Sequence, residues 1–168
     1  DVDYEINANY GYHPKRNKTF EEKFYKNQNL FKKIIYTVNN FGHRISPHID
    51  NVNNCLLFHG GSIVFGQSVN DNETLPYRTF EKLNNKFLVF NFGFNGYGPH
   101  QFLAKIENNY LEELNKCNNL FVIYLYIQDH IGRVAGKRSW GDKSPRYIYN
   151  QDKLIHKGFF SDYPFKLI

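Results

Sequence analysis

The stretch Cys55-Leu-Leu-Phe-His-Gly-Gly-Ser62, followed by Ile63-Val-Phe-Gly66, decides the fold of this chain. Its apolar run, Cys55–Phe58, is short and uninterrupted, as in a strand that is buried on both faces of a sheet. The run ends in His59-Gly-Gly-Ser62, where two glycines permit a tight turn out of the strand. The sequence therefore predicts a buried strand that leads directly into a turn carrying a serine.

Two further apolar runs, Phe87–Phe92 and Leu120–Ile127, share this organisation. The first ends in the loop Gly93–Gly98, and the second ends in Gln128–His130. Strands that stop at polar or glycine-rich loops are typical of a parallel sheet, in which the functional loops lie at the carboxyl ends of the strands. We therefore expect all three runs to be core strands of one parallel sheet.

Two helices are predicted between these strands. One lies around Tyr77–Leu83, with Thr74 as its cap and Pro76 near its first turn. The other covers Pro99–Leu114, where apolar residues recur at helical spacing. The alternation of strands and helices indicates an α/β domain.

The segments on either side of this pattern differ from it. Residues 1–50 are polar and aromatic, and their β-prone run Leu30–Val38 predicts a small β-rich structure. Beyond the third strand, Arg146–Tyr149 and Leu154–Ile155 flank a polar turn and predict a short hairpin. We expect an N-terminal β-rich extension over residues 1–50 and an α/β domain over residues 51–168.

The composition excludes several classes of protein. The 168 residues contain no apolar run of the roughly 18–20 residues that would span a bilayer. Two cysteines, Cys55 and Cys117, are too few for a disulfide-rich fold, and their spacing matches no zinc ligand set. The formal net charge is +5, but the basic residues are scattered and the aromatic residues lie in apolar runs, so we expect no nucleic-acid partner.

Ser62 is the strongest candidate for a catalytic residue. A serine in a tight turn after a buried strand can act as a nucleophile, and its own N–H can help to hold a tetrahedral oxyanion. The preceding glycines permit the backbone that such a turn requires. A serine in a glycine-rich turn is also common without a catalytic role, so this feature alone leaves both interpretations open.

The stretch Phe58–Pro76 resembles the first block of the SGNH, or GDSL, hydrolases, in which a strand leads to a nucleophilic serine, an acidic turn and a helix. Asn91–Gly98 resembles the second block, where Gly96 matches a glycine whose N–H donates to the oxyanion hole. The lead-in Tyr36–Arg44 is similar to the segment before the nucleophile strand in bacterial members with an N-terminal β extension. The resemblance covers residues of about 36–135. It implies a three-layer α/β/α, flavodoxin-like sheet that is incomplete at the C-terminus of this chain.

Some positions depart from the pattern of that family. Gly61 stands where the family has an aspartate before the nucleophile. Gln128 and Asp129 stand where the third block has Asn-Asp, and the asparagine of that block donates to the oxyanion. The resemblance therefore implies Gln128 as this donor, with the neighbouring His130 as the alternative.

The general base of the family is a histidine three residues after an aspartate, near the C-terminus. No Asp-x-x-His occurs in this sequence, and Asp152 and His156 are one residue too far apart. Serine is a weak nucleophile without an adjacent base. We therefore expect the base to lie on polypeptide outside this chain, which we interpret as a truncated piece.

The remaining candidates are less specific. His100 opens the second predicted helix and is a candidate substrate contact, whereas Asp129 belongs either to the site or to a pair with Arg133. Trp140 fits a packed loop as well as a substrate wall. The other histidines form no convincing metal set, so we expect no metal and no organic cofactor.

These features predict a serine esterase or acyl-transfer enzyme that forms an acyl-enzyme at Ser62. The expected substrate is a small-molecule, lipid or acylated-sugar ester, and the sequence does not distinguish among these classes. A non-catalytic binding domain with the same fold is one alternative. A basic nucleic-acid-binding domain is the other. The oligomeric state and the cellular compartment are not predicted.

Overall fold

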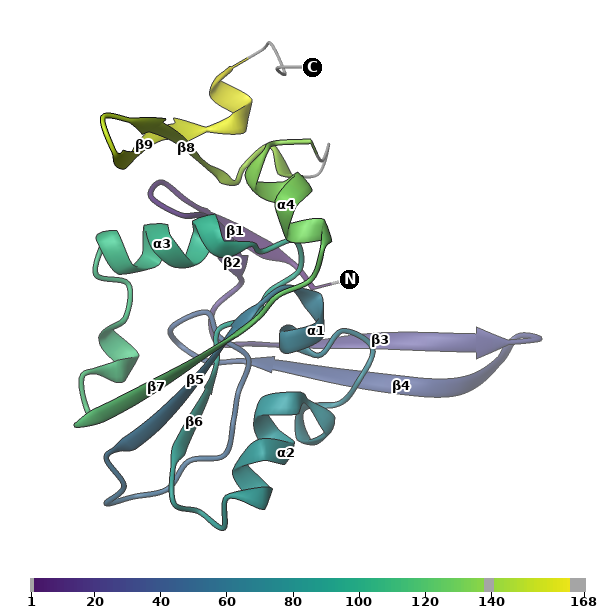
Figure 1. Cartoon of the computed structure of the whole chain (residues 1–168). Coiled ribbons are helices and arrows are strands. Elements are labelled where there is room, and N and C mark those ends of the chain that lie inside the picture. Colours follow the sequence, from purple (N-terminus) through teal and green to yellow (C-terminus); the bar gives the residue numbers. More distant parts are fainter. Residues whose placement is uncertain (1, 138–140, 164–168) are drawn as a thin grey trace.

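The computed structural model describes residues 2–137 and 141–163, which form a mixed α/β structure around a parallel sheet of three strands (Figure 1). Strand β5 (Asn54–Gly60) lies in the centre, between β6 (Leu88–Asn91) and β7 (Asn119–Leu125). Both neighbours run parallel to β5. The prediction of three parallel strands is confirmed.

The side chains of β5 alternate between two apolar layers, because successive residues of a strand point to opposite faces. Leu57 belongs to the cluster that α3 (Pro99–Glu107) covers. Leu56 belongs to the cluster on the other face, which α2 (Leu75–Lys82) covers. The central strand is therefore buried on both faces, as its uninterrupted apolar run predicts.

Helix α2 begins as the sequence predicts. The Oγ1 atom of Thr74 accepts a hydrogen bond from the N–H of Tyr77 at 3.3 Å, and Pro76 lies in the first turn. A proline is tolerated there because the first N–H groups of a helix have no partner within the helix.

Helix α3 is shorter than predicted. It ends at Glu107 because Asn109 adopts a left-handed backbone with φ of +56°, and the chain then forms the short 3₁₀ helix η2 (Glu112–Leu114). Leu111 and Leu114 nevertheless pack into the cluster that α3 covers. The periodicity therefore predicts the buried face of this segment correctly and its helical length incorrectly.

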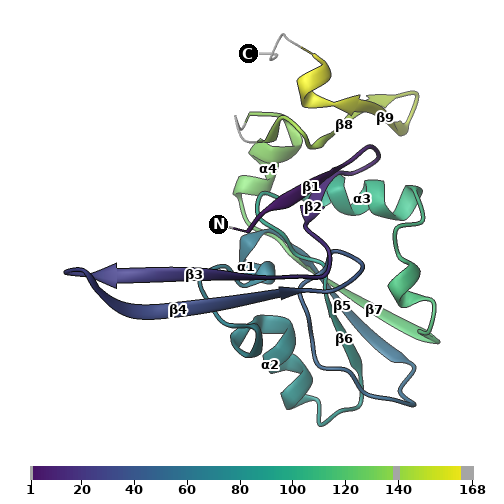
Figure 2. The ribbon, with the colours of Figure 1, turned by 180° about the vertical axis from the view of Figure 1, so that it is seen from behind.

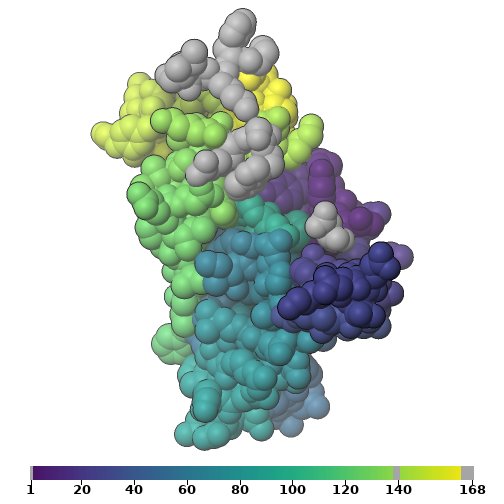
Figure 3. Space-filling view, turned by 90° about the vertical axis from the view of Figure 1, so that its right-hand side faces the viewer, coloured from purple at the N-terminus to yellow at the C-terminus, as the bar shows by residue number. Residues whose placement is uncertain are grey.

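Two antiparallel hairpins precede the sheet. Strand β1 (Tyr4–Asn7) pairs with β2 (Gly11–Pro14), and β3 (Lys18–Lys26) pairs with β4 (Asn29–Val38). The second hairpin extends away from the sheet (Figures 1 and 2), and Figure 3 looks toward its dark-blue tip. The prediction of a strand at Leu30–Val38 is confirmed.

A third hairpin follows the sheet. Helix α4 (Asp129–Val134) comes first, and β8 (Pro145–Asn150) then pairs with β9 (Lys153–Phe159) before the turn η4 (Phe160–Asp162). The predicted hairpin is therefore confirmed. Within residues 2–137 and 141–163, we find no helix with the length and apolarity needed to span a membrane.

Strand β7 lies at an edge of the sheet, which corrects the expectation that its apolar run is buried. It pairs only with β5 among the described strands. Four consecutive apolar side chains are between 40% and 55% exposed: those of Leu120, Phe121, Val122 and Ile123. A run of this kind is buried only where both faces of a strand and both of its edges are covered.

Arg44 is a fully buried side chain that joins several segments. Its guanidinium donates five hydrogen bonds, four to main-chain carbonyl oxygens and one to a carboxylate. The acceptors are the carbonyls of Ile35, Phe65, Gly66 and Val69 and the carboxylate of Asp71. The guanidinium also lies over the Tyr36 ring, with its Cζ atom 4.6 Å from the ring centroid. These contacts compensate the burial of its charge.

The main chain of Arg44 connects the two parts of the fold. It forms antiparallel bridges with Val38 at the end of β4 and with Asn91 at the end of β6. The β3–β4 hairpin is thereby joined to the edge of the parallel sheet. The backbone and the side chain of one residue thus hold the hairpin against the α/β body.

A second buried polar group, Lys105 of α3, fixes the loops around the first hairpin. Its Nζ atom lies 3.2 Å from Nε2 of His43, whose Nδ1 atom lies 2.6 Å from Oε2 of Glu113. Lys105 donates to His43, and His43 donates to Glu113. Burial lowers the pKa of Lys105 to about 7 and raises the pKa of Glu113 to about 7. The Tyr10 ring, from the turn between β1 and β2, lies 4.9 Å from the ammonium.

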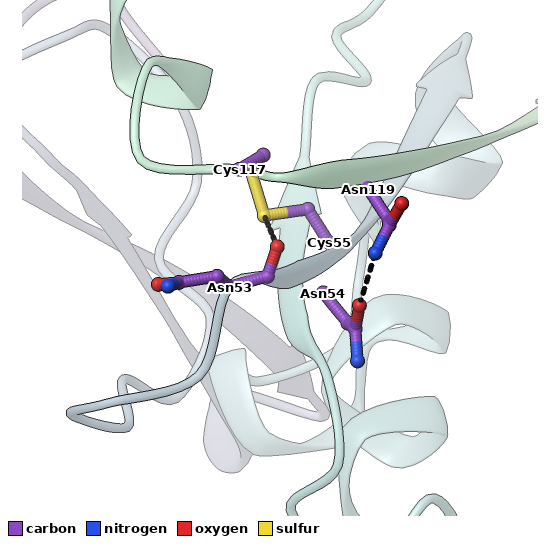
Figure 4. The surroundings of a disulfide bond; sticks show 5 residues. All are labelled: Asn53, Asn54, Cys55, Cys117 and Asn119. Carbon is purple, nitrogen blue, oxygen red and sulfur yellow. Dashed lines mark hydrogen bonds between the residues drawn. A yellow bond between two sulfur atoms is a disulfide. The ribbon is translucent and has the colours of Figure 1, made fainter.

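A disulfide bond joins Cys55 at the start of β5 to Cys117, which precedes β7 (Figure 4). The two Cα atoms lie 5.6 Å apart, and 62 positions separate the residues in sequence. Beside the bond, Nδ2 of Asn119 donates to Oδ1 of Asn54 at 2.9 Å. The sequence analysis did not predict this pairing, which ties the first strand of the sheet to the last.

Reduction of the disulfide is expected to lower the free energy of unfolding by about 4 kcal/mol, because a closed loop of this length restricts the unfolded chain. Urea denaturation with and without dithiothreitol measures the change. In the double variant Cys55→Ala, Cys117→Ala, the reductant should have no effect. An equal effect of the reductant on both proteins would contradict the disulfide.

The variant Arg44→Lys is expected to lower the free energy of unfolding by about 3 kcal/mol. A lysine has at most three donors for five acceptors, and it leaves buried carbonyl oxygens without partners. The matched control is Arg78→Lys on α2, where an exposed pair with Glu81 predicts a change of less than about 0.5 kcal/mol. Similar losses in the two variants would show that Arg44 does not hold the fold.

Candidate active site

Ser62 lies in the turn directly after the central strand β5. It is the first residue of the short helix α1 (Ser62–Phe65), which begins after Gly61 and ends at Gly66. Gly66 has φ of +82°, a backbone conformation that glycine adopts without strain. The predicted transition from a buried strand to a turn carrying Ser62 is confirmed, and the serine is half-buried.

Gly61 has no room for a side chain. A Cβ atom at this position would lie 2.7 Å from Nη1 of Arg133, 3.4 Å from the carbonyl oxygen of Tyr97 and 3.5 Å from Nε2 of His130. The space that an aspartate would need is therefore taken by the guanidinium of Arg133. These distances also show that two other segments, α4 and the loop after β6, converge on the turn before Ser62.

The loop after β6 lies against the Ser62 turn. The N–H of Phe94 donates to the carbonyl oxygen of Gly60 at 3.3 Å, and a Cβ atom on Gly93 would lie 2.5 Å from the amide nitrogen of Phe65. Asn91 fixes the same junction, because its side-chain amide donates to the carbonyl of Val64 at 2.9 Å. The close approach of the two backbones explains the glycine at position 93.

Gly96 lies at the far end of this loop, with φ of +79°. Its N–H and the N–H of Ser62 donate no hydrogen bond to another described residue. Both backbone donors are therefore without a partner in the described part of the chain. Such donors stabilise negative charge on an oxygen atom when they converge on it.

Helix α4 is tied to the same loop through Arg133. Nε of Arg133 donates to Oδ2 of Asp129 at 2.8 Å, and Nη1 donates to the carbonyl oxygen of Tyr97 at 2.6 Å. The expected pair of Asp129 with Arg133 is therefore present. Asp129 holds the arginine that in turn holds the loop carrying Gly96.

His130 is buried, and one of its ring nitrogens has a defined partner. Nδ1 lies 2.6 Å from the hydroxyl oxygen of Tyr124, whereas Nε2 is buried without a partner among the described residues. The hydroxyl has no other acceptor in the described part of the chain, so we assign it as the donor to Nδ1. The proton of the ring then lies on Nε2. Burial and, to a smaller degree, the charge of Arg133 lower the pKa of His130 to about 4, so the ring is neutral at pH 7.

The other predicted site residues lie in different surroundings. Gln128 is exposed at the N-cap of α4. His100 is 4% exposed, lies edge-to-face with the Phe160 ring at 6.4 Å and has a pKa that burial lowers to about 3. His59 is fully buried beneath the turn and stacks on Phe102 at 4.4 Å.

Asp152 and His156 lie in the β8–β9 hairpin and are not joined to each other. Asp152 accepts a hydrogen bond from the Tyr149 hydroxyl at 2.9 Å, and His156 stacks on Tyr147 at 5.2 Å. These contacts agree with the sequence, in which the two residues are one position too far apart for the Asp-x-x-His pair of the family. Trp140 lies outside the described residues.

The sequence did not predict the role of Tyr124, whose hydroxyl contacts Nδ1 of His130. The only sequence signal was a tyrosine within an apolar strand, six residues before the histidine, and the same residue type is common in ordinary core strands. It also missed the side chain of Arg44, although Arg44 lies in the segment that carries the family resemblance. Tyr124 contacts a histidine in a different element, and Arg44 donates to carbonyl groups that are distant in sequence.

The carboxyl end of β5 places the Ser62 turn against the loop after β6 and close to His130 of α4. A serine in such a turn can act as a nucleophile toward a carbonyl carbon. The described residues contain no group of three or more His, Cys, Asp or Glu side chains that could hold a metal ion. No known protein-family model matches the sequence, and no curated protein is similar to it.

Proposed function

We propose that the protein is a serine esterase or acyl-transfer enzyme related to the SGNH hydrolases, with Ser62 as its nucleophile. The observation that carries the proposal is the position of Ser62 at the carboxyl end of the central strand, in a turn that the loop after β6 and His130 of α4 approach closely. In parallel α/β sheets, this end of the strands is where ligands bind. The three-layer arrangement of that family is part of the proposal.

In the proposed reaction, the Oγ atom of Ser62 bonds to the ester carbonyl carbon while a base accepts its proton. The carbonyl oxygen becomes an oxyanion, which the N–H groups of Ser62 and Gly96 stabilise together with Nε2–H of His130. The C–O bond to the alcohol then breaks, the alcohol takes up a proton, and an acyl-enzyme remains at Ser62. Water, or a second alcohol in acyl transfer, attacks the acyl carbon and releases the serine.

His130 is a better third donor than Gln128. Gln128 is exposed, whereas the N–H of His130 is buried, has no acceptor among residues 2–137 and 141–163, and lies next to Gly61. An unsatisfied buried donor is costly to a protein unless it has a purpose such as ligand binding. The glycine at position 61 fits the same proposal, because it leaves room for Arg133 and His130 beside the nucleophile.

The alternative is a non-catalytic binding domain with the same fold. One observation favours it: no hydrogen bond joins a described histidine to Oγ of Ser62. The neutral His130, with its proton on Nε2, is not a base for Ser62. The proposed reaction therefore depends on another proton acceptor, and reactivity of the serine distinguishes the two functions.

A fluorophosphonate probe is expected to label Ser62 in the full-length protein, because the reagent reports an activated serine. Labelling is followed by mass spectrometry of the modified peptide. The variant Ser62→Ala should lose the label, and the control variant Ser161→Ala, at an exposed serine far along the chain, should keep it. A correctly folded protein that is not labelled at Ser62 would favour the binding domain.

The variant His130→Ala is expected to lower kcat for ester hydrolysis roughly 100-fold, because it removes one donor to the oxyanion. Tyr124→Phe should lower kcat about tenfold, since the Nε2–H tautomer is no longer favoured. The matched control is Tyr126→Phe, because the Tyr126 ring also contacts His130 but its side chain is 57% exposed.

Imidazole ¹⁵N chemical shifts test the assignment separately from activity. The wild-type protein should show a protonated Nε2 and an unprotonated Nδ1 at His130, and Tyr124→Phe should mix the two tautomers. A protonated Nδ1 in the wild-type protein would contradict the donor role of His130.

A further inference from the structure

A hollow of about 540 Å³ lies beside Gly96. Its walls are mainly apolar and aromatic, with contributions from Val2, Tyr4, Tyr12 and Phe94. The size lies within the range of small-molecule sites in proteins. Such a lining is suited to an apolar group of a ligand.

The aromatic walls belong to two segments that are distant in sequence. The Tyr4 and Tyr12 rings come from β1 and β2 and meet edge-to-face at 5.7 Å, and the Phe94 ring meets Tyr12 at 5.9 Å. The Tyr12 hydroxyl donates to the carbonyl oxygen of Asn95 at 3.0 Å. The first hairpin is thus bonded to the loop that carries Gly96, and the hollow lies between them.

The hollow is linked through Val2 and Phe94 to helix α1, which begins at Ser62. Val2 also lines a smaller hollow together with Phe65 and Gln67, which follow Ser62 closely in the chain. The rings of Phe65 and Phe94 meet edge-to-face at 5.2 Å. Figures 1 and 2 both show the beginning of β1 beside α1.

We propose that this hollow binds the acyl chain of the substrate, and that the substrates are esters of straight-chain acids. The proposal rests on the proposed function, since it places the acyl carbon at Ser62 and the chain beyond Gly96. The aromatic rings exclude water from the chain, and each buried methylene favours binding. The charged side chains of Asp142 and Lys143 line the hollow and are exposed, so both stay in contact with water.

The length of the acyl chain should control hydrolysis. For p-nitrophenyl esters from acetate to octanoate, kcat/KM is expected to rise about fourfold per methylene in the wild-type protein. Val2→Phe fills the hollow and should abolish this rise. Tyr4→Ala removes one wall and should weaken the rise. The control Tyr149→Ala, at a side chain that is 70% exposed on β8, should retain it.

Binding is measured without catalysis by ¹H–¹⁵N NMR titration with octanoate. The amides of Asn95 and Gly96 should shift in the wild-type protein and in Tyr149→Ala, and they should not shift in Val2→Phe. Circular dichroism confirms that each variant is folded.

The outcomes separate the two proposals. Octanoate shifts without ester hydrolysis or probe labelling would support the hollow and overturn the proposed function. Hydrolysis that does not depend on chain length, with no octanoate shifts, would overturn the acyl site and leave the esterase intact. Shifts with methyl glucoside in place of octanoate would overturn the acyl site in favour of a carbohydrate site.

Discussion

The burial of one charged side chain, Arg44, is the constraint on which the rest of the structure depends. A guanidinium inside a protein has to find acceptors for its N–H groups, because an unpaired charge there costs several kcal/mol. The carbonyls at Ile35, Phe65 and Val69 satisfy this need only when the hairpin, α1 and the following loop converge on one point. The end of α1 is therefore fixed from outside the sheet, and its first residue, Ser62, is fixed with it.

The burial of Lys105 imposes a similar constraint on another part of the N-terminal region. Its chain of contacts through His43 to Glu113 joins the loop after β4 to the segment after α3, and the Tyr10 ring brings in the first hairpin. The residues before the sheet are thereby packed as part of the same body. This packing is what allows the first hairpin to contribute side chains beside Gly96.

Local sequence patterns predicted the strands and helices but not the contacts that arrange them. Apolar runs identified β5 and β6, because buried parallel strands need continuous apolar sequence. The same rule mispredicted the burial of β7, since a run of residues does not reveal whether a strand lies at an edge. Arg44 and Lys105 were missed because their partners lie far away in sequence, and a buried cation has no local signature. Ser62 was predicted from its turn after a buried strand and Gly96 from the family resemblance, whereas the contact of Tyr124 with His130 required the structure.

The register of the sheet controls the chemistry at His130. Tyr124 is the partner of His59 in the pairing of β7 with β5, and the two rings lie 5.8 Å apart. A shift of one residue would turn the Tyr124 hydroxyl to the other face of the sheet, away from Nδ1 of His130. Because burial keeps His130 neutral, the position of its single proton depends on that hydroxyl. The pairing of two backbone strands thus determines whether the imidazole presents a donor or an acceptor beside Ser62.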